Sequence, residues 1–204
     1  MKRVITAQDV PAAGELRVPI GTIVTSTAWE VAASRGVRIV ELPEEQLSAL
    51  APPNLTIAIG SDHGGFRLKE TLKIFIEAQG LSIRDVGVAE EKPADYPDIA
   101  HMVANLVAAG TATRGVIIDG AGIGSCMAAN KVAGVRAAMC VTPTLARYAR
   151  EHNGANVLTL GATLLSTDAA LAIVDTWLQT PMTEPRYIRR LAKIHRLETG
   201  GAAK

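Results

Sequence analysis

The sequence has few aromatic residues, no surplus of either charge and no long apolar run, and each shortage excludes a class of protein. Phe, Trp and Tyr make up 3% of the 204 residues and hydrophobic residues 48%, so the core must consist of Ala, Val, Ile and Leu. That composition is typical of helices packed on a parallel sheet. Lys plus Arg number 21 and Asp plus Glu 20, so no global field attracts nucleic acid or an anionic membrane, and any anion binding must be local.

Cysteine is also scarce. The two residues of this type, Cys126 and Cys140, are too few for a disulfide framework. We interpret them as reduced thiols in a cytoplasmic protein. The opening MKRVITAQDV has no apolar run suited to a signal peptide, and no window approaches the roughly 18 apolar residues of a membrane span.

A proline-containing break, APPN at 51–54, is predicted to separate an N-terminal extension, residues 1–50, from a main domain, residues 55–197. In the main domain, short apolar segments alternate with helical patterns. Strands are expected at 55–60, 82–87, 115–119, 135–140 and 156–161, and helices at 66–79, 98–109, 123–131, 143–152, 167–179 and 185–197. The alternation predicts an α/β domain with a Rossmann-like, doubly wound sheet of five parallel strands and helices on both faces.

The N-terminal extension is predicted to be a small α+β unit. Residues 15–24 look extended, 25–36 resemble a short capped helix, and 37–42 resemble a strand. The segment has no catalytic constellation and too little apolar material to fold alone. We expect it to pack on the main domain, on a partner subunit or on another protein.

One glycine-rich segment, IIDGAGIGSCMAANK at 117–131, follows a predicted strand and opens a helix. Backbone N–H groups in such a turn converge on one point, where they can hold an oxyanion or a phosphate. A dinucleotide fingerprint would need a third glycine at Ser125, and a P-loop would need Gly-Lys-Ser/Thr, so we set both aside. The alternative is a tight turn that needs glycine for steric reasons alone.

Two other segments place titratable side chains next to predicted strands. Asp62 and His63, in GSDHGGF, follow the first strand and suit proton transfer to a small ligand; the alternative is that Asp62 caps the next helix. His152 and Asn153, in AREHNGANVL, close a helix, where both residue types are common.

The C-terminal helical pattern is basic. Arg186, Arg190 and Lys193 share one face by their spacing. This is a solvated face unless the protein binds a phosphate, for which the planar guanidinium is well suited.

In their order along the chain, these segments resemble the family of ribose-5-phosphate isomerase B and galactose-6-phosphate isomerase. The resemblance covers residues 55 to about 196 and rests on IGSDHGGFRLKE, the step Asp95-Tyr96-Pro97-Asp98, GAGIG with AANKV and GVRAA, and the segment AREHN followed by ANVL and LG. It implies an aldose–ketose isomerase that works through an enediolate without metal or organic cofactor. It also implies a homodimer or tetramer whose active sites are shared between subunits.

The resemblance assigns a role to each candidate residue. His152 would assist ring opening, and Asp62 would bind or protonate sugar oxygens. The backbone of the glycine bend would hold the enediolate, an oxyanion role that agrees with the interpretation of this segment above. The other substrate-binding residues would be His63 and Asn153 with Arg186 and Arg190, and the bend comprises Gly120, Ala121, Gly122, Ile123, Gly124 and Ser125.

The base that moves the proton between C1 and C2 departs from the family pattern. One branch has a cysteine at the position of Asp119, and another has a glutamate at the position of Ser125. Three hypotheses follow: Asp119 is the base, Cys126 is the base in a shifted turn, or proton transfer is lost and the protein only binds sugar phosphates. A family arginine is Thr163 here and a family histidine is Tyr187.

The extension has a resemblance of its own. KRVITAQDV through TAWEVAASRGVRIVE is similar to the start of an ethanolamine-utilisation protein found with bacterial microcompartments. That implies microcompartment shell or cargo proteins as partners and a protein inside such a compartment. The alternatives are an extension that supports the dimer and, for the whole chain, a non-catalytic assembly component.

Overall fold

The computed structural model describes residues 4–43 and 55–200. The chain divides into two compact units, Met1–Asn54 and Leu55–Lys204. The predicted proline break at 51–54 lies outside the described residues.

The smaller unit pairs its strands in two parallel ribbons around one helix. Strand β1 (Val4–Ile5) pairs with β3 (Ile23–Val24), and β2 (Glu15–Pro19) pairs with β4 (Arg38–Leu42). A 3-10 turn, η1 (Ala7–Asp9), follows β1, and α1 (Ser26–Arg35) precedes β4. The segment predicted as extended over 15–24 is interrupted, because Thr22 N–H donates to Pro19 O (3.1 Å) and Gly21 has a φ of 81°.

The helix of this unit has clear end signals. The Thr25 hydroxyl accepts from Ala28 N–H, and Gly36 ends α1 in the left-handed conformation. The core is a single small cluster: Ile5, Val10, Val18, Ala28, Ala32 and Val37.

The larger unit contains the predicted sheet of five parallel strands, which the structure confirms. The strands are β5 (Thr56–Ser61), β6 (Ser82–Asp85), β7 (Arg114–Asp119), β8 (Ala137–Met139) and β9 (Val157–Gly161). Their order across the sheet is β6-β5-β7-β9-β8, and every neighbouring pair is parallel.

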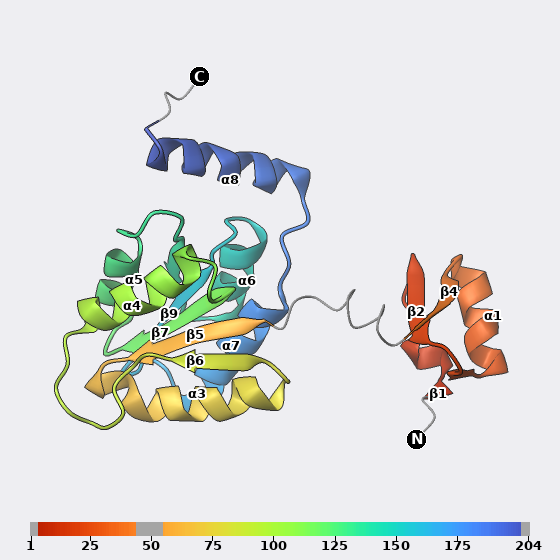
Figure 1. Ribbon diagram of the computed structural model, residues 1–204, viewed down its shortest axis with the longest axis horizontal. Coiled ribbons are helices and arrows are strands. Elements are labelled where there is room, and N and C mark those ends of the chain that lie inside the picture. The colour runs from red at the N-terminus through yellow and green to blue at the C-terminus, as the bar shows by residue number, and fades with distance from the viewer. Residues whose placement is uncertain (1–3, 44–54, 201–204) are drawn as a thin grey trace. The chain divides into compact units, whose positions relative to one another are not determined.

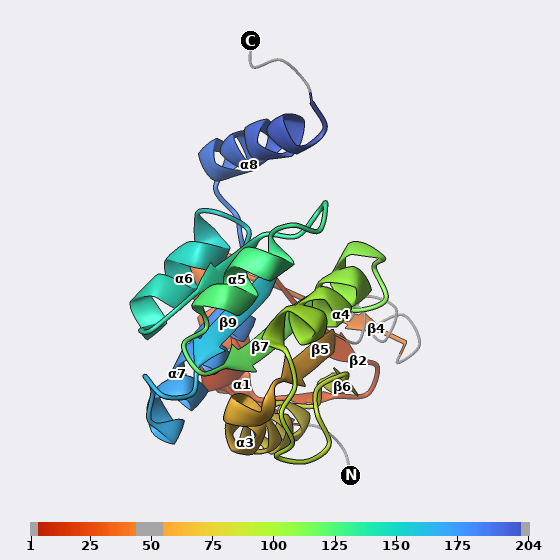
Figure 2. The same ribbon diagram turned by 90° about the vertical axis from the view of Figure 1, so that its left-hand side faces the viewer.

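Helices cover both faces of this sheet (Figures 1 and 2). One face carries α3 (Phe66–Ala78), α6 (Pro143–Glu151) and α7 (Thr167–Gln179), and the other carries α4 (Tyr96–Ala108) and α5 (Ile123–Ala129). The strands alternate between these layers because successive side chains of a strand point to opposite faces. Ile57 and Ile59 pack in the first core and Ala58 in the second.

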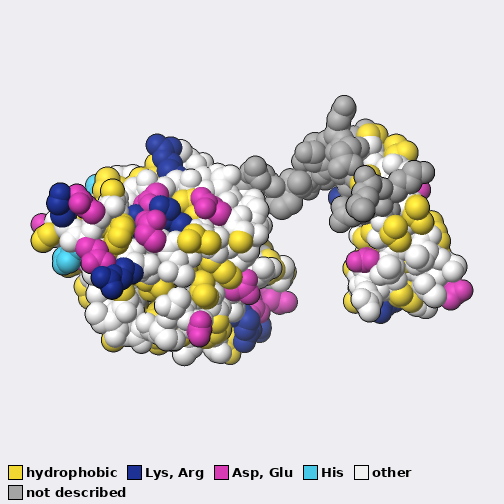
Figure 3. Space-filling model, turned by 90° about the horizontal axis from the view of Figure 1, so that it is seen from below, with side chains coloured by type: hydrophobic (Ala, Val, Ile, Leu, Met, Phe, Trp, Pro, Cys, Tyr) yellow, Lys and Arg dark blue, Asp and Glu magenta, His cyan; other side chains and the backbone are white. Residues whose placement is uncertain are grey.

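The last helix, α8 (Pro185–Glu198), continues the chain after α7. It has a polar, basic side, and Tyr187 is its only residue classed as buried. No helix among the described residues is long and apolar enough to cross a membrane. Figure 3 shows that positive and negative side chains are interspersed on the visible face of the larger unit.

Two predicted helix boundaries were wrong. Helix α4 begins at Tyr96, so Asp98 lies in its first turn and Asp95 occupies the N-cap position. Pro97 explains the earlier start, because proline suits the first turn of a helix. Helix α5 ends at Ala129, where the Asn130 side chain turns away to bond both the N–H and the C=O of Ala137.

The sheet has a switch point between β5 and β7. From β5 the chain crosses to β6 on one side, and β7 lies on the other side of β5. Connections that leave in opposite directions open a crevice at the carboxyl ends of these two strands. Asp62 follows β5 and Gly120 follows β7, so both loops selected from the sequence border this crevice.

Candidate active site

The loop after β5 contains Asp62 and His63. The Asp62 carboxylate is 8% exposed and accepts from Gly65 N–H (3.0 Å), so it caps the 3-10 turn η2 (His63–Gly65). Gly65 must be glycine, because a Cβ there would lie 2.5 Å from Ile118 O. The loop therefore packs directly on β7. The second carboxylate oxygen of Asp62 accepts no hydrogen bond from the described residues.

His63 is exposed, and its Nδ1 accepts from Ala94 N–H (3.4 Å). A ring nitrogen that accepts a hydrogen bond carries no proton, so the neutral imidazole has its proton on Nε2. His63 can therefore offer an N–H donor to a ligand.

The bend after β7 is fixed by contacts from β9 and its following loop. Thr159 Oγ donates to Gly122 O (2.7 Å), and Thr163 Oγ donates to Gly120 O (2.6 Å). Gly122 has a φ of 76°, and a Cβ there would lie 2.9 Å from the carbonyl carbon of Leu160. The steric need for glycine that the sequence offered as an alternative is thus present at Gly122.

Asp119 is turned into this bend and is 4% exposed. One carboxylate oxygen accepts from the N–H groups of Ala121 (2.8 Å) and Gly122, and the other accepts from the N–H (3.1 Å) and hydroxyl of Ser125. A carboxylate has about four lone-pair sites, so this arrangement occupies all of them. Asp119 braces the bend as well as bordering the crevice.

The bend keeps unused donors. The N–H groups of Gly120, Ile123 and Gly124 donate to no acceptor within residues 4–43 and 55–200. Gly124 lies under the ring of Tyr96, since a Cβ there would be 2.5 Å from ring atoms. The predicted oxyanion set of Gly120 to Gly124 is therefore divided, because the amides of Ala121 and Gly122 serve Asp119.

Cys126 points away from the bend. Its thiol donates to Ala137 O (3.4 Å), the first residue of β8. Ala137 pairs with Val157 at the start of β9, whereas Asp119 pairs with Gly161 at its end. The structure therefore places Cys126 toward the amino ends of the strands and does not bring it beside Asp119.

His152 and Asn153 lie at the far end of the sheet from Asp119. Helix α6 starts after the carboxyl end of β8 and runs back, so His152 precedes the start of β9. The His152 ring lies between two tyrosines: it stacks on Tyr148 (ring centroids 4.6 Å apart) and packs at a tilt of 31° against Tyr187 of α8 (4.3 Å). Asn153 Nδ2 donates to Tyr148 O (3.1 Å), which holds the two residues together.

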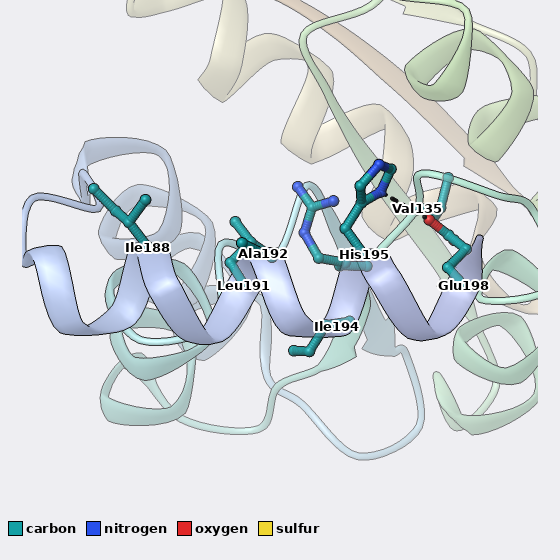
Figure 4. Close-up of a pocket in the computed structure, with 8 residues that line it drawn as sticks. Val135, Ile188, Leu191, Ala192, Ile194, His195 and Glu198 are labelled. Carbon is teal, nitrogen blue, oxygen red and sulfur yellow. Dashed lines mark ion pairs between the residues drawn. The ribbon is translucent and has the colours of Figure 1, made fainter. Parts of the chain in front are cut away.

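The two arginines of α8 join this aromatic cluster. Arg186 donates to the Tyr187 hydroxyl (2.9 Å), and the guanidinium groups of Arg186 and Arg190 lie 4.7 and 5.7 Å from the Tyr187 ring centre. Further along α8, a pocket of about 400 Å³ separates the helix from Val135 and Arg136. Figure 4 shows His195 and Glu198 beside Val135, joined by an ion pair.

The predicted site residues thus form two groups within one chain. Asp62, His63 and the bend with Asp119 lie at the carboxyl ends of the strands, and His152, Asn153, Arg186 and Arg190 lie toward the amino ends. The length of strand β9 lies between them, about 13 Å for four residue steps of about 3.3 Å each. The two groups therefore lie at opposite ends of the sheet within a single chain.

Two contributing residues, Tyr96 and Lys69, were not predicted as site residues: Tyr96 appeared only within a motif and Lys69 only within the string FRLKE. Ser125 was predicted as part of the bend, but its contact with Asp119 was not. The pattern of apolar and polar residues around a turn does not predict hydrogen bonds within it, such as those from Ser125 to the Asp119 carboxylate. Among the described residues, no three His, Cys, Asp or Glu side chains lie together as candidate metal ligands.

The larger unit is thus a Rossmann-like α/β domain with a crevice between two loops at its switch point. The chain belongs to the Ribose/Galactose Isomerase family, whose model matches residues 57–194. It is 38% identical over 142 residues to ribose-5-phosphate isomerase B of Escherichia coli (strain K12), covering 70% of this chain and 95% of that protein.

Two more comparisons support the same class. D-erythrulose-4-phosphate isomerase of Pectobacterium atrosepticum is 39% identical over 126 residues, covering 61% of this chain and 82% of that protein. The solved structure of Clostridium thermocellum ribose-5-phosphate isomerase B is 43% identical, with a TM-score of 0.69, and covers 71% of this chain and 98% of that one. The protein is therefore a sugar-phosphate isomerase with a Rossmann-like fold.

Proposed function

We propose that the protein interconverts ribose 5-phosphate and ribulose 5-phosphate, or a closely related aldose–ketose phosphate pair, through an enediolate. The observation that carries this proposal is the crevice between β5 and β7, where the unused amides of the glycine bend lie beside the Asp62 loop. The two loops approach closely at Gly64, which follows Asp62 in the first loop. A Cβ on Gly64 would lie 3.4 Å from Asp62 Oδ1 and 3.8 Å from Gly120 N in the second loop. Preorganised donors at such a point stabilise developing negative charge.

Each group has a role in this mechanism. The free amides of Gly120, Ile123 and Gly124 bind the enediolate oxygens, and Asp62 exchanges protons with them through its unoccupied oxygen. His63 donates from Nε2 to the substrate. Asp119 is the proposed base, and movement of the Ser125 hydroxyl frees the lone pair that receives the proton from carbon.

The distant group completes the site from a second copy of the chain. His152 assists ring opening, and Asn153, Arg186 and Arg190 bind hydroxyl and phosphate oxygens. The support for a second copy is the separation of the two groups within one chain, together with exposed apolar side chains on α6 and α8: Leu145, Tyr148, Ile188 and Ile194. Encapsulation in a microcompartment and the role of residues 1–50 stay predictions.

The decisive experiment follows exchange of the C2 proton of ribose 5-phosphate in deuterated water. The wild type is expected to exchange it, and Asp119→Asn to lower the rate about 10³-fold, the size of a lost general base. Ser125→Ala separates bracing from proton transfer, because it removes a brace of Asp119 and leaves the carboxylate; its rate is expected to stay within about tenfold of the wild type.

Two results would contradict parts of this proposal. Exchange in Asp119→Asn within tenfold of the wild type would restrict Asp119 to bracing the bend. A wild type that exchanges erythrose 4-phosphate but not ribose 5-phosphate would move the substrate to tetrose phosphates, as the erythrulose-4-phosphate isomerase among its relatives suggests.

A further inference from the structure

Lys69 is a buried ammonium group outside the residues assigned to the reaction. Its side chain is 1% exposed, although it lies on α3 only a few residues after the Asp62 loop. Its Nζ contacts Asp85 Oδ2 (2.7 Å), Val88 O (2.8 Å) and Glu70 Oε1 (3.1 Å). An ammonium has three N–H donors, so every donor is used, and one of them fixes the backbone of the chain after β6.

That stretch of chain, residues 86–96, is defined here as the β6–α4 segment; in Figure 1 it is the yellow-green loop that leads into α4. Its first part lines the end of β5, since Val86 N–H donates to Ile59 O (2.9 Å) and Val88 N–H to Ser61 O (3.1 Å). Gly87 leaves no free space between them, because a Cβ there would lie 2.5 Å from Ser61 N and 3.1 Å from Lys69 Cδ.

The other end of the β6–α4 segment touches both loops of the crevice. Ala94 N–H donates to His63 Nδ1 (3.4 Å), and the Tyr96 ring covers Gly124. Between these ends the segment is exposed from Glu90 to Lys92, where Glu91 pairs with the exposed Arg67 of α3. Of the two side-chain ties from α3 to the segment, the one made by Lys69 is the one shielded from solvent.

We propose that Lys69 is a positioning residue of the isomerase: by holding Val88 O and Asp85 together, it sets the place of the β6–α4 segment and hence of His63 and Tyr96 over the glycine bend. Removal of one partner of a buried ion pair lowers stability whatever its role. The proposal is therefore tested by a local change in the β6–α4 segment, which a role in stability alone would not produce. The catalytic part of this proposal rests on the proposed function.

The chain supplies a matched control in Lys73, one turn further along α3. Lys73 contacts the same Asp85 (2.8 Å) and the same Glu70 (3.1 Å), but its contacts include no backbone atom of the β6–α4 segment. Lys69→Met and Lys73→Met therefore remove the same charge beside the same carboxylates. Only Lys69→Met removes the tie to Val88.

The first measurement is hydrogen–deuterium exchange of the full chain, which needs no substrate. In Lys69→Met, peptides from 86–96 are expected to exchange about tenfold faster than in the wild type, while peptides from β9 and α7 are unchanged. Lys73→Met is expected to match the wild type throughout. Equal exchange of 86–96 in the two variants would overturn the proposal.

The second measurement is steady-state turnover of ribose 5-phosphate. Lys69→Met is expected to lower kcat by about 10- to 100-fold, with a smaller change in KM, because misplacing groups around the bend costs the chemical step. Lys73→Met stays within about twofold. An unchanged kcat in Lys69→Met overturns the catalytic part, whereas an inactive wild type overturns the proposed substrate and leaves the exchange result to decide the role of Lys69.

Discussion

At the scale of single residues, the carboxylates of this protein differ in what occupies their oxygens. Asp62 accepts one backbone N–H, whereas Asp119 accepts three N–H groups and a hydroxyl. Asp62 therefore keeps a carboxylate oxygen that can bind a ligand. In Asp119 both oxygens are used to hold the glycine bend. Asp85 has a third environment, between two lysines.

The pH dependence of stability tests the environment of Asp85. Burial raises the pKa of its carboxyl group, but hydrogen bonds from Lys69, Lys73 and Gly87 N–H outweigh burial, so its pKa lies below the ordinary value for an aspartate. A carboxyl whose pKa is depressed on folding stabilises the fold above its unfolded pKa. That stabilisation is lost as the pH falls through the lower, folded pKa.

We expect Asp85→Asn to lower the free energy of unfolding at pH 7 by roughly 2 kcal/mol. This is less than the cost of breaking a fully buried ion pair, because Lys69 keeps its contacts with Val88 O and the Glu70 carboxylate. The difference from the wild type should shrink as the pH falls below about 4. Urea unfolding at pH 7 and pH 3 measures it. A difference that is equal at both pH values would show that the charge of Asp85 contributes nothing.

At the scale of elements, α8 links the basic C-terminal face to the imidazole of His152. Tyr187 is 7% exposed, packs its ring against His152 and accepts a hydrogen bond from Arg186. A residue that replaces a family histidine thus keeps an aromatic ring against His152. Through Tyr187, helix α8 brings Arg186 and Arg190 close to the His152 imidazole. The spacing of basic residues along α8 does not predict this contact with α6.

Substitutions at Tyr187 separate the ring from the hydroxyl. Tyr187→Phe keeps the aromatic ring against His152 and should retain kcat within about threefold. Tyr187→Leu removes that ring contact, so the His152 imidazole is held less firmly and kcat should fall about tenfold. Steady-state kinetics with ribose 5-phosphate measure both variants, and circular dichroism checks that α8 is intact. A Leu variant as active as the Phe variant would exclude a positioning role for the ring.

At the scale of the whole molecule, the separation of the two residue groups predicts that one copy of the chain has no complete site. The carboxyl-end group and the amino-end group meet only if two copies associate. Closed two-fold association supplies two equal composite sites, each with one group from each copy.

Mixing two inactive variants tests this arrangement. In a random mixture of Asp119→Asn and His152→Ala chains, half of the dimers are mixed, and each mixed dimer has one site with neither substitution. Activity should therefore return to about a quarter of the wild type. Asp119→Asn mixed with Asp62→Asn is the control and should recover nothing, since both changes fall in the same group. No recovery in the first mixture would mean that each chain builds its own site.

The sequence by itself determined the strands and helices of the larger unit. Alternation of apolar segments with helical patterns is a local property, and five parallel strands follow from it because each helix must return the chain to the same edge. Motif order also placed the Asp62 loop and the glycine bend at that edge. The start of α4 at Tyr96 depends on Pro97, because proline suits the first turn of a helix.

The tertiary structure alone decided which groups are free to act. Three of the four hydrogen bonds to the Asp119 carboxylate come from backbone N–H groups, and Lys69 reaches the backbone carbonyl of Val88. The directions of these backbone groups depend on φ and ψ, which residue types do not determine. The separation of His152 from Asp119 depends on the direction in which α6 runs. These contacts join residues through space, and for that reason the chemistry of the site had to await the fold.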